Sequence, residues 1–136
     1  MKSIANRLFL FSAAALSLGT AAYGQTTLKA DVPFAFQMPG GATAAGQYTV
    51  QLDSTASGKI VHINNRQTRR SALSLANKLD SKAHEAIAPR LVFRCGQAGC
   101  QLSEVWTPEG GYSLPAGGVH HDPEYTTSIP LTAIQN

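Results

Sequence analysis

Apolar and polar residues alternate with a period of two over much of the chain after residue 25. Successive side chains of a β-strand point to opposite faces, so this alternation predicts strands with one buried face. The clearest runs are residues 26–38, 47–52, 59–64, 71–76, 91–95 and 100–106, separated by turn-forming residues. The pattern predicts an all-β protein, a single small antiparallel β-sandwich or open barrel of about six to eight strands.

Two of these runs carry specific expectations. Pro33 lies inside the first run, where proline cannot donate a ladder hydrogen bond. We therefore expect either an edge strand, which could accept a partner strand, or two short strands with a break. The small residues 42–46 are expected to form a loop. In the run 71–76, alternation predicts a strand with Leu73 and Leu75 facing inward.

Residues 90–106 contain both cysteines and the only tryptophan. Two alternating runs flank the loop 96–99, which begins and ends with glycine and favours a hairpin. This register places Cys95 opposite Cys100 and predicts a disulfide. The Cys-x4-Cys spacing differs from the Cys-x2-Cys of redox motifs and many zinc sites. Trp106 has the parity of Leu102 and Phe93, which favours a position in the core.

Residues 1–24 have the pattern of a secretory signal peptide. Lys2 and Arg7 precede an apolar run over residues 8–18, which is too short to span a bilayer comfortably. Small residues precede a cut after Gly24, and a cut after Ala22 is the alternative. We therefore expect a secreted or periplasmic protein whose β-rich domain is residues 25–136. Residues 125–134 are expected to form a weak last strand or a frayed tail, in the second case as part of a loose tail over residues 118–136.

The charge of the chain gives no argument for a nucleic-acid partner. The net charge is +3, but Lys2 and Arg7 belong to the predicted signal peptide. Nine of the 11 Lys and Arg then remain against eight Asp and Glu, which leaves +1. No membrane span is expected after cleavage. The local cluster of Arg66, Arg69 and Arg70 is interpreted as an exposed turn.

Candidate chemistry is sparse. The chain has no Gly-x-Ser-x-Gly elbow, and we expect neither a catalytic residue nor a cofactor. The densest set of potential metal ligands is His120, His121, Asp122 and Glu124. Adjacent residues of an extended chain point to opposite faces, which opposes chelation of one ion by both histidines. A metal-binding protein that uses this segment, or a small hydrolase, is therefore the alternative function.

Aromatic side chains are the remaining candidates for ligand contact. Tyr112, Tyr125 and, if it is exposed, Trp106 are suited to stack on sugars or to pack against a protein. The expected function is an exported non-enzymatic β-domain, a binding or structural module of the cell envelope or extracellular space. Its expected partner is an envelope polysaccharide or a protein.

Several of these strands together resemble a family of small exported β-rich bacterial proteins of unknown function. The shared pattern consists of Val-Pro-Phe-x-Phe at residues 32–36, Ala-Gly-x-Tyr-x-Val at 45–50, Leu-x-Phe at 91–93 and Leu-Ser-x-Val-Trp at 102–106. The chain departs from that pattern at residues 43–44, where the family has Leu-Pro, and in the cysteine pair at the hairpin tip. The resemblance implies export and a β-rich fold, and it implies no activity.

Overall fold

The computed structural model describes residues 26–80, 88–116 and 125–134. Within these ranges the chain is all-β, which confirms the predicted fold class, and no helix is long and apolar enough to cross a membrane. The predicted signal peptide, residues 1–24, lies outside them. The described residues form eleven strands, more than expected, because the first run is divided in two and short strands form at residues 41–43, 110–113, 125–130 and 132–133. They are β1 (Leu28–Val32), β2 (Phe36–Met38), β3 (Gly41–Thr43), β4 (Gly46–Thr55), β5 (Gly58–Asn65), β6 (Ser71–Lys78), β7 (Arg90–Gly96), β8 (Gly99–Thr107), β9 (Gly110–Ser113), β10 (Tyr125–Pro130) and β11 (Thr132–Ala133).

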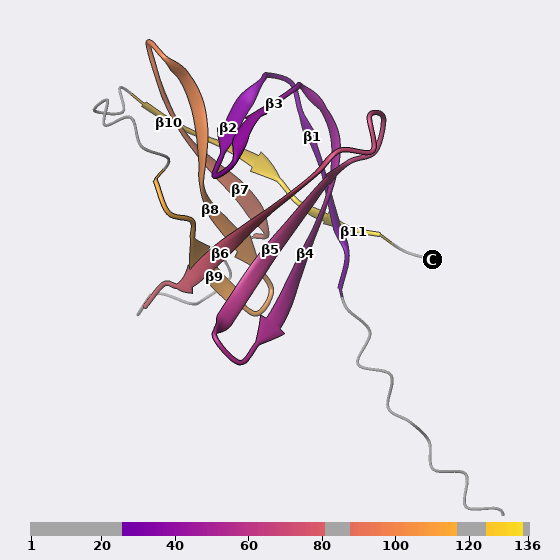
Figure 1. The fold of residues 1–136 in the computed structure, drawn as a ribbon, viewed down its shortest axis with the longest axis vertical. Helices are drawn as coiled ribbons and strands as arrows, with labels where there is room; N and C mark the ends of the chain where they lie inside the picture. The colour runs from indigo at the N-terminus through magenta and orange to yellow at the C-terminus, as the bar shows by residue number, and fades with distance from the viewer. Residues whose placement is uncertain (1–25, 81–87, 117–124, 135–136) are drawn as a thin grey trace, which may run out of the picture.

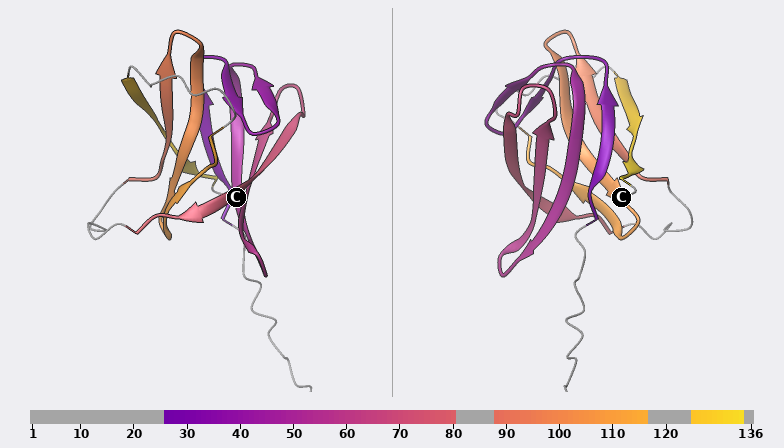
Figure 2. Two further views of the ribbon diagram at one scale, coloured as in Figure 1. Left: turned by 60° about the vertical axis from the view of Figure 1, so that its left-hand side comes forward. Right: turned by 90° about the vertical axis from the view of Figure 1, so that its right-hand side faces the viewer.

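These strands form a single mixed sheet in the order β10-β7-β8-β9-β6-β5-β4-β1-β11, with β2 beside β8 and β3 beside β2 (Figure 1). Every pairing is antiparallel except the parallel pairing of β2 with β8. The sheet curls so that its two halves face each other (Figure 2). It is not closed into a barrel, although β10 and β11 follow each other in sequence and pair with β7 and β1, respectively.

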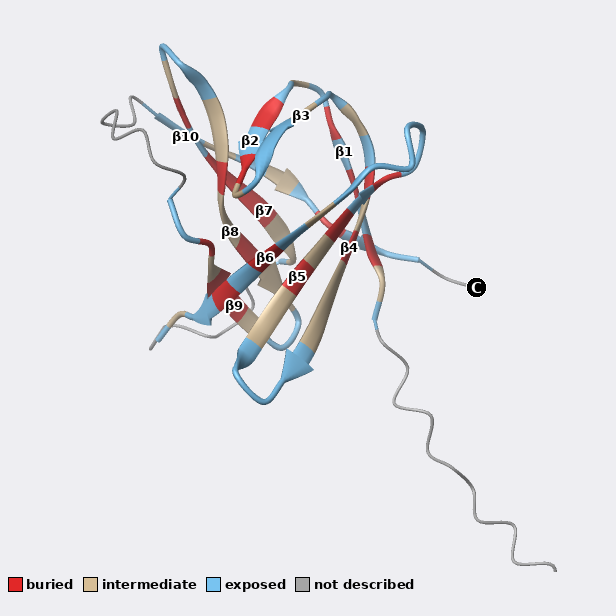
Figure 3. Ribbon diagram, in the orientation of Figure 1, coloured by how far each residue is buried: buried red, intermediate tan, exposed pale blue. Residues whose placement is uncertain are grey.

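The core fills the space between the two halves, and buried positions alternate with exposed ones along the strands (Figure 3). Four aromatic side chains from both halves meet edge to face. Phe36 of β2 lies 5.2 Å from Tyr48 of β4 and 5.1 Å from Phe93 of β7, measured between ring centroids. Phe34 adds a third contact with Phe93 at 5.0 Å. Because aromatic contacts of this geometry add to the burial energy, this cluster joins the two halves.

Pro33 separates β1 from β2, which confirms the alternative of two short strands with a break. β1 pairs with β4 along its whole length and with β11 at Leu28 and Lys29. The expected loop at residues 42–46 is wrong in part, because β3 forms a small hairpin with β2. The segment after residue 124 forms β10 and β11, so the alternative of a strand describes it better than a loose tail.

The hairpin of β7 and β8 has the predicted register at its tip and a different one at its base. Cys95 pairs with Cys100, and the two form a disulfide. Farther along, Phe93 pairs with Leu102 but Val92 pairs with Glu104, so Ser103 is an extra residue in β8. Such a β-bulge reverses the parity of the residues after it.

The bulge moves Trp106 out of the core. Leu102 and Val105, three residues apart, are both fully buried, and Glu104 and Trp106 are half-buried on the outer face. The expectation that Trp106 lies in the core is therefore wrong. The same bulge explains why Glu104 interrupts the apolar alternation of this strand.

Candidate functional site

The outer face of β6 carries the most exposed leucines among the described residues. Leu73 is 57% exposed and Leu75 is 60% exposed. The expectation that both face inward is wrong, and the register with β5 gives the reason. Val61 and Ile63 of β5 are buried, and they pair with Ser74 and Ala72, respectively. Directly paired residues share a face, so the residues between them, the leucines, point outward.

β6 also has a free edge. Its pairing with β9 is limited to Asn77 and Lys78, whereas β5 pairs along residues 71–76. Among the strands that the structure describes, residues 71–76 therefore have a hydrogen-bonded neighbour on one side only. We call this segment the β6 edge.

The direction of the free backbone groups follows from the ladder. The N–H of Asn65 donates to the carbonyl of Arg70 at 2.8 Å, and hydrogen-bonded pairs alternate in an antiparallel ladder. The N–H and C=O groups of Ser71, Leu73 and Leu75 therefore point away from β5. Leu79 has the same parity as these three residues. Its N–H donates to the carbonyl of Gly111 in β9 at 2.9 Å, which shows that groups of this parity point to the side of β6 away from β5.

A groove of about 490 Å³ lies between the start of β6 and the β2–β3 hairpin. In both views of Figure 2 this hairpin lies beside the turn that joins β5 to β6. Tyr48 and Ile63 give the groove an apolar part, and Thr68, Arg70 and Ser71 give it a polar part. The hydroxyl of Tyr48 donates to the carbonyl of Ala44 and ties the far wall to β4. The groove therefore lies at the start of the β6 edge, beside Ser71 and Ala72.

The turn over residues 65–70, the basic turn, holds three arginines at one end of the β6 edge. The buried Asn65 fixes its shape, because its side-chain oxygen accepts the N–H groups of Gln67 and Thr68 at 2.9 and 3.0 Å. The Arg69 N–H donates to the Asn65 carbonyl at 2.9 Å. Arg69 has a φ of 57°, a left-handed conformation that is uncommon for arginine. All three arginines of the turn are exposed, as expected.

A second polar cluster surrounds Trp106 on the outer face. Its ring nitrogen donates to a carboxylate oxygen of Glu104 at 2.8 Å, and the Arg90 guanidinium lies 5.7 Å from the ring centroid. Across the ladder, the ring covers Gly111 so closely that a Cβ there would lie 2.6 Å from ring carbons. The Arg90 Nε is buried and has no hydrogen-bond partner among the described residues. These contacts hold the half-buried ring in place on the outer face.

The other predicted contact residues separate in the structure. Tyr112 is wrong as an exposed aromatic, since it is 3% exposed and belongs to the core. Tyr125 is 58% exposed, opens β10 and pairs with Cys95. Tyr125 therefore stays a candidate for ligand contact, and it lies on a different strand from the β6 edge.

The predicted metal ligands His120, His121, Asp122 and Glu124 lie outside the described residues. Within the described ranges no three His, Cys, Asp or Glu side chains gather in a way that could hold a metal ion. A pair that the sequence did not indicate is His62 and Asp53, whose Nε2 and Oδ2 atoms lie 2.8 Å apart. The two residues lie on β5 and β4 as diagonal neighbours, two positions apart in the ladder, so only the strand register could have revealed them.

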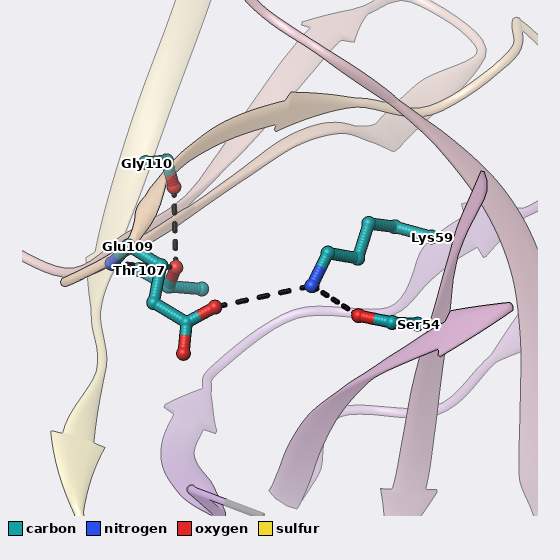
Figure 4. A network of polar contacts seen from close by, with 5 residues as sticks. All are labelled: Ser54, Lys59, Thr107, Glu109 and Gly110. Carbon is teal, nitrogen blue, oxygen red and sulfur yellow. Dashed lines mark hydrogen bonds and ion pairs between the residues drawn. The ribbon is translucent and has the colours of Figure 1, made fainter.

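The opposite end of β5 carries a surface network (Figure 4). Lys59 Nζ donates to Ser54 Oγ at 2.5 Å and lies 4.0 Å from a carboxylate oxygen of Glu109. Thr107 Oγ1 donates to the Gly110 carbonyl at 3.2 Å and accepts the Glu109 N–H at 3.2 Å. The Glu109 side chain is largely exposed, so its ion pair with Lys59 contributes about 1 kcal/mol at most. This network connects two exposed turns at the surface.

Similarity to known proteins adds nothing to this geometry. No family model matches this chain, and no curated protein and no solved structure matches it.

Proposed function

We propose that this protein is an exported, non-enzymatic binding module that takes an extended peptide segment as an added strand along the β6 edge. The single observation that carries the proposal is that the backbone groups of Ser71, Leu73 and Leu75 point away from β5 and have no strand partner among the described residues, beside a groove at the start of β6. In strand addition, main-chain hydrogen bonds supply affinity, and pockets for alternate side chains supply specificity.

Within the part of the chain that the structure describes, residues 71–76 lack the features that usually protect a sheet edge. Natural edges are blocked by charged residues, by proline, by bulges or by a covering loop. Residues 71–76 read Ser-Ala-Leu-Ser-Leu-Ala, and the ladder with β5 has no register shift there. An edge of this kind invites association, which favours a dedicated partner over an inert surface.

The two faces of an added strand would meet different surroundings. Side chains on its outer face would lie beside Leu73 and Leu75, and those on its inner face would point toward the groove near Ala72 and Ile63. This difference provides a physical basis for selecting a sequence. It also favours a protein segment over a polysaccharide as the ligand, because backbone groups pair with another backbone.

Export is the second part of the proposal. The pattern of residues 1–24 supports it, and so does the Cys95–Cys100 disulfide, because such bonds persist in oxidising compartments. The resemblance to small exported β-rich proteins agrees with both.

A proline substitution tests strand addition directly. The N–H of Leu73 points away from β5, so Leu73→Pro removes a hydrogen bond to an added strand and leaves the β5–β6 ladder intact. Random peptides displayed on phage would be selected on the wild-type protein, and the enriched peptides would be measured by fluorescence anisotropy. We expect Leu73→Pro to fold and to weaken their binding by about tenfold or more. The matched variant Leu73→Val, which keeps the N–H, should retain binding.

Amide exchange gives a second readout. With bound peptide, the amide hydrogens of Ser71, Leu73 and Leu75 should exchange more slowly, because they would then be paired. Strand addition is rejected if no peptide is enriched, if Leu73→Pro binds as well as the wild type, or if these amides stay unprotected in the complex.

A further inference from the structure

The β6 edge lies between two groups of positive charge. Arg66, Arg69 and Arg70 precede it in the basic turn, and the exposed Lys78 follows it. Residues 65–78 contain these four cations and no Asp or Glu, so the segment carries a charge of +4. Asp53, on the outer face two strands away, is already engaged by His62.

The basic turn is organised before any ligand arrives. The hydrogen bonds of the buried Asn65 hold its backbone, so little ordering of the main chain is needed on binding. Arg70 lines the groove, at the end where an added strand would begin or finish. A guanidinium in such a position is suited to a carboxylate, which it can bind through two parallel hydrogen bonds.

The same charges oppose a second copy of this chain as the occupant. Two β6 strands paired antiparallel would bring the arginines of one copy close to Lys78 of the other. Two β6 strands paired in parallel would bring the basic turns of both copies together. Like charges facing each other across strands are destabilising, so the edge is electrostatically unsuited to self-pairing.

We infer that the partner of the β6 edge is an extended segment with alternating apolar residues and with Asp or Glu where it meets the basic turn. The apolar residues cover Leu73 and Leu75, and the carboxylates pair with Arg69 and Arg70. This inference rests on the proposed strand addition and specifies the chemistry of its ligand.

Three labelled peptides test the inference. They share the centre Val-Thr-Val-Thr-Val and are flanked at both ends by Glu, by Gln or by Lys, so either strand direction is sampled. Anisotropy with the purified protein should show the Glu-flanked peptide binding about tenfold more tightly than the Gln-flanked one, with the Lys-flanked one weakest. Added salt should reduce that advantage.

Charge variants assign the effect to the turn. The double variant Arg69→Gln and Arg70→Gln should lose the preference for Glu and bind the Gln-flanked peptide unchanged. Arg94→Gln, which removes an exposed arginine on β7, is the matched control and should keep the preference.

The outcomes separate this inference from the proposed function. Equal binding of the Glu- and Gln-flanked peptides would overturn the charge preference and leave strand addition standing. Absence of binding by all three, together with no enriched peptide, would reject strand addition itself. A dimer in sedimentation experiments that Leu73→Pro abolishes would make a second copy the occupant and would overturn the inference.

Discussion

Gly111→Ala should expose how tightly the Trp106 ring is held. Gly111 pairs directly with Trp106 across β8 and β9. A Cβ at position 111 would lie 2.6–2.7 Å from three carbons of the ring, closer than atoms in proteins approach. The ring must therefore move, and it would then strain or lose its contacts with Glu104 and Arg90.

The contacts of the ring set the size of the effect. A hydrogen bond to a carboxylate contributes about 1.5–3 kcal/mol. A cation–π contact at a partly exposed site contributes about 0.5–1 kcal/mol. Alanine also restricts the unfolded chain more than glycine, which offsets about 0.4–1 kcal/mol of the loss. Because the ring can shift partly without losing every contact, we expect Gly111→Ala to lower the free energy of unfolding by about 1–2 kcal/mol.

Urea unfolding of four proteins measures this coupling: the wild type, Gly111→Ala, Trp106→Ala and the double variant. In the Trp106→Ala background the ring is absent, so Gly111→Ala should be neutral or stabilise by about 0.5 kcal/mol. Near-ultraviolet circular dichroism should show a changed tryptophan signal in Gly111→Ala. Equal effects in both backgrounds would refute the reasoning that the ring occupies the space above Gly111.

Two further predictions concern the hairpin and export. Phe93 is fully buried, so Phe93→Ala should cost about 3–5 kcal/mol in urea unfolding, whereas replacing Cys95 and Cys100 by serine should cost about 2–3 kcal/mol at most; the opposite ranking would mean that the disulfide, and not the buried face, holds the hairpin. Intact-mass analysis of the exported protein should show cleavage after Gly24, or after Ala22 in the alternative; a mass that still includes residues 1–24 would contradict the signal peptide.

Features that depend on local pattern could be predicted from the sequence. Alternation placed strands in most of the correct stretches, and the turn at residues 96–99 placed Cys95 opposite Cys100. Both depend on residues that are close in sequence, where the twofold period of a strand leaves few choices. The burial of Leu91, Phe93 and Leu102 follows from the same local register.

Features that depend on the register between strands could not be predicted in this way. Trp106 lies outside the core because one extra residue, Ser103, reverses parity in β8. Glu104 interrupts the apolar alternation there, but the local pattern does not identify a bulge as the cause. Leu73 and Leu75 face outward because Val61 and Ile63 select the partners that share the core. Considered alone, residues 71–76 favour burial of the two leucines. The pairing with β5 gives the opposite orientation, because the buried residues of β5 lie opposite Ala72 and Ser74.

The outward position of Leu73 and Leu75 leaves apolar surface in contact with solvent. The free energy gained by covering that surface sets how much the two leucines can contribute to binding a partner. Full burial of a leucine is worth about 1.5–3 kcal/mol, and Leu73 and Leu75 are somewhat more than half exposed. Covering both therefore yields about 2–4 kcal/mol.

Association costs at least about 4 kcal/mol in lost translational and rotational freedom. The leucines alone are too weak to hold a partner, so the backbone groups of Ser71, Leu73 and Leu75 that point away from β5 and the charges of the basic turn would have to supply the remainder. Only an extended chain that carries both hydrogen-bonding groups and carboxylates supplies both, and this requirement favours an acidic peptide strand over an apolar ligand at the β6 edge.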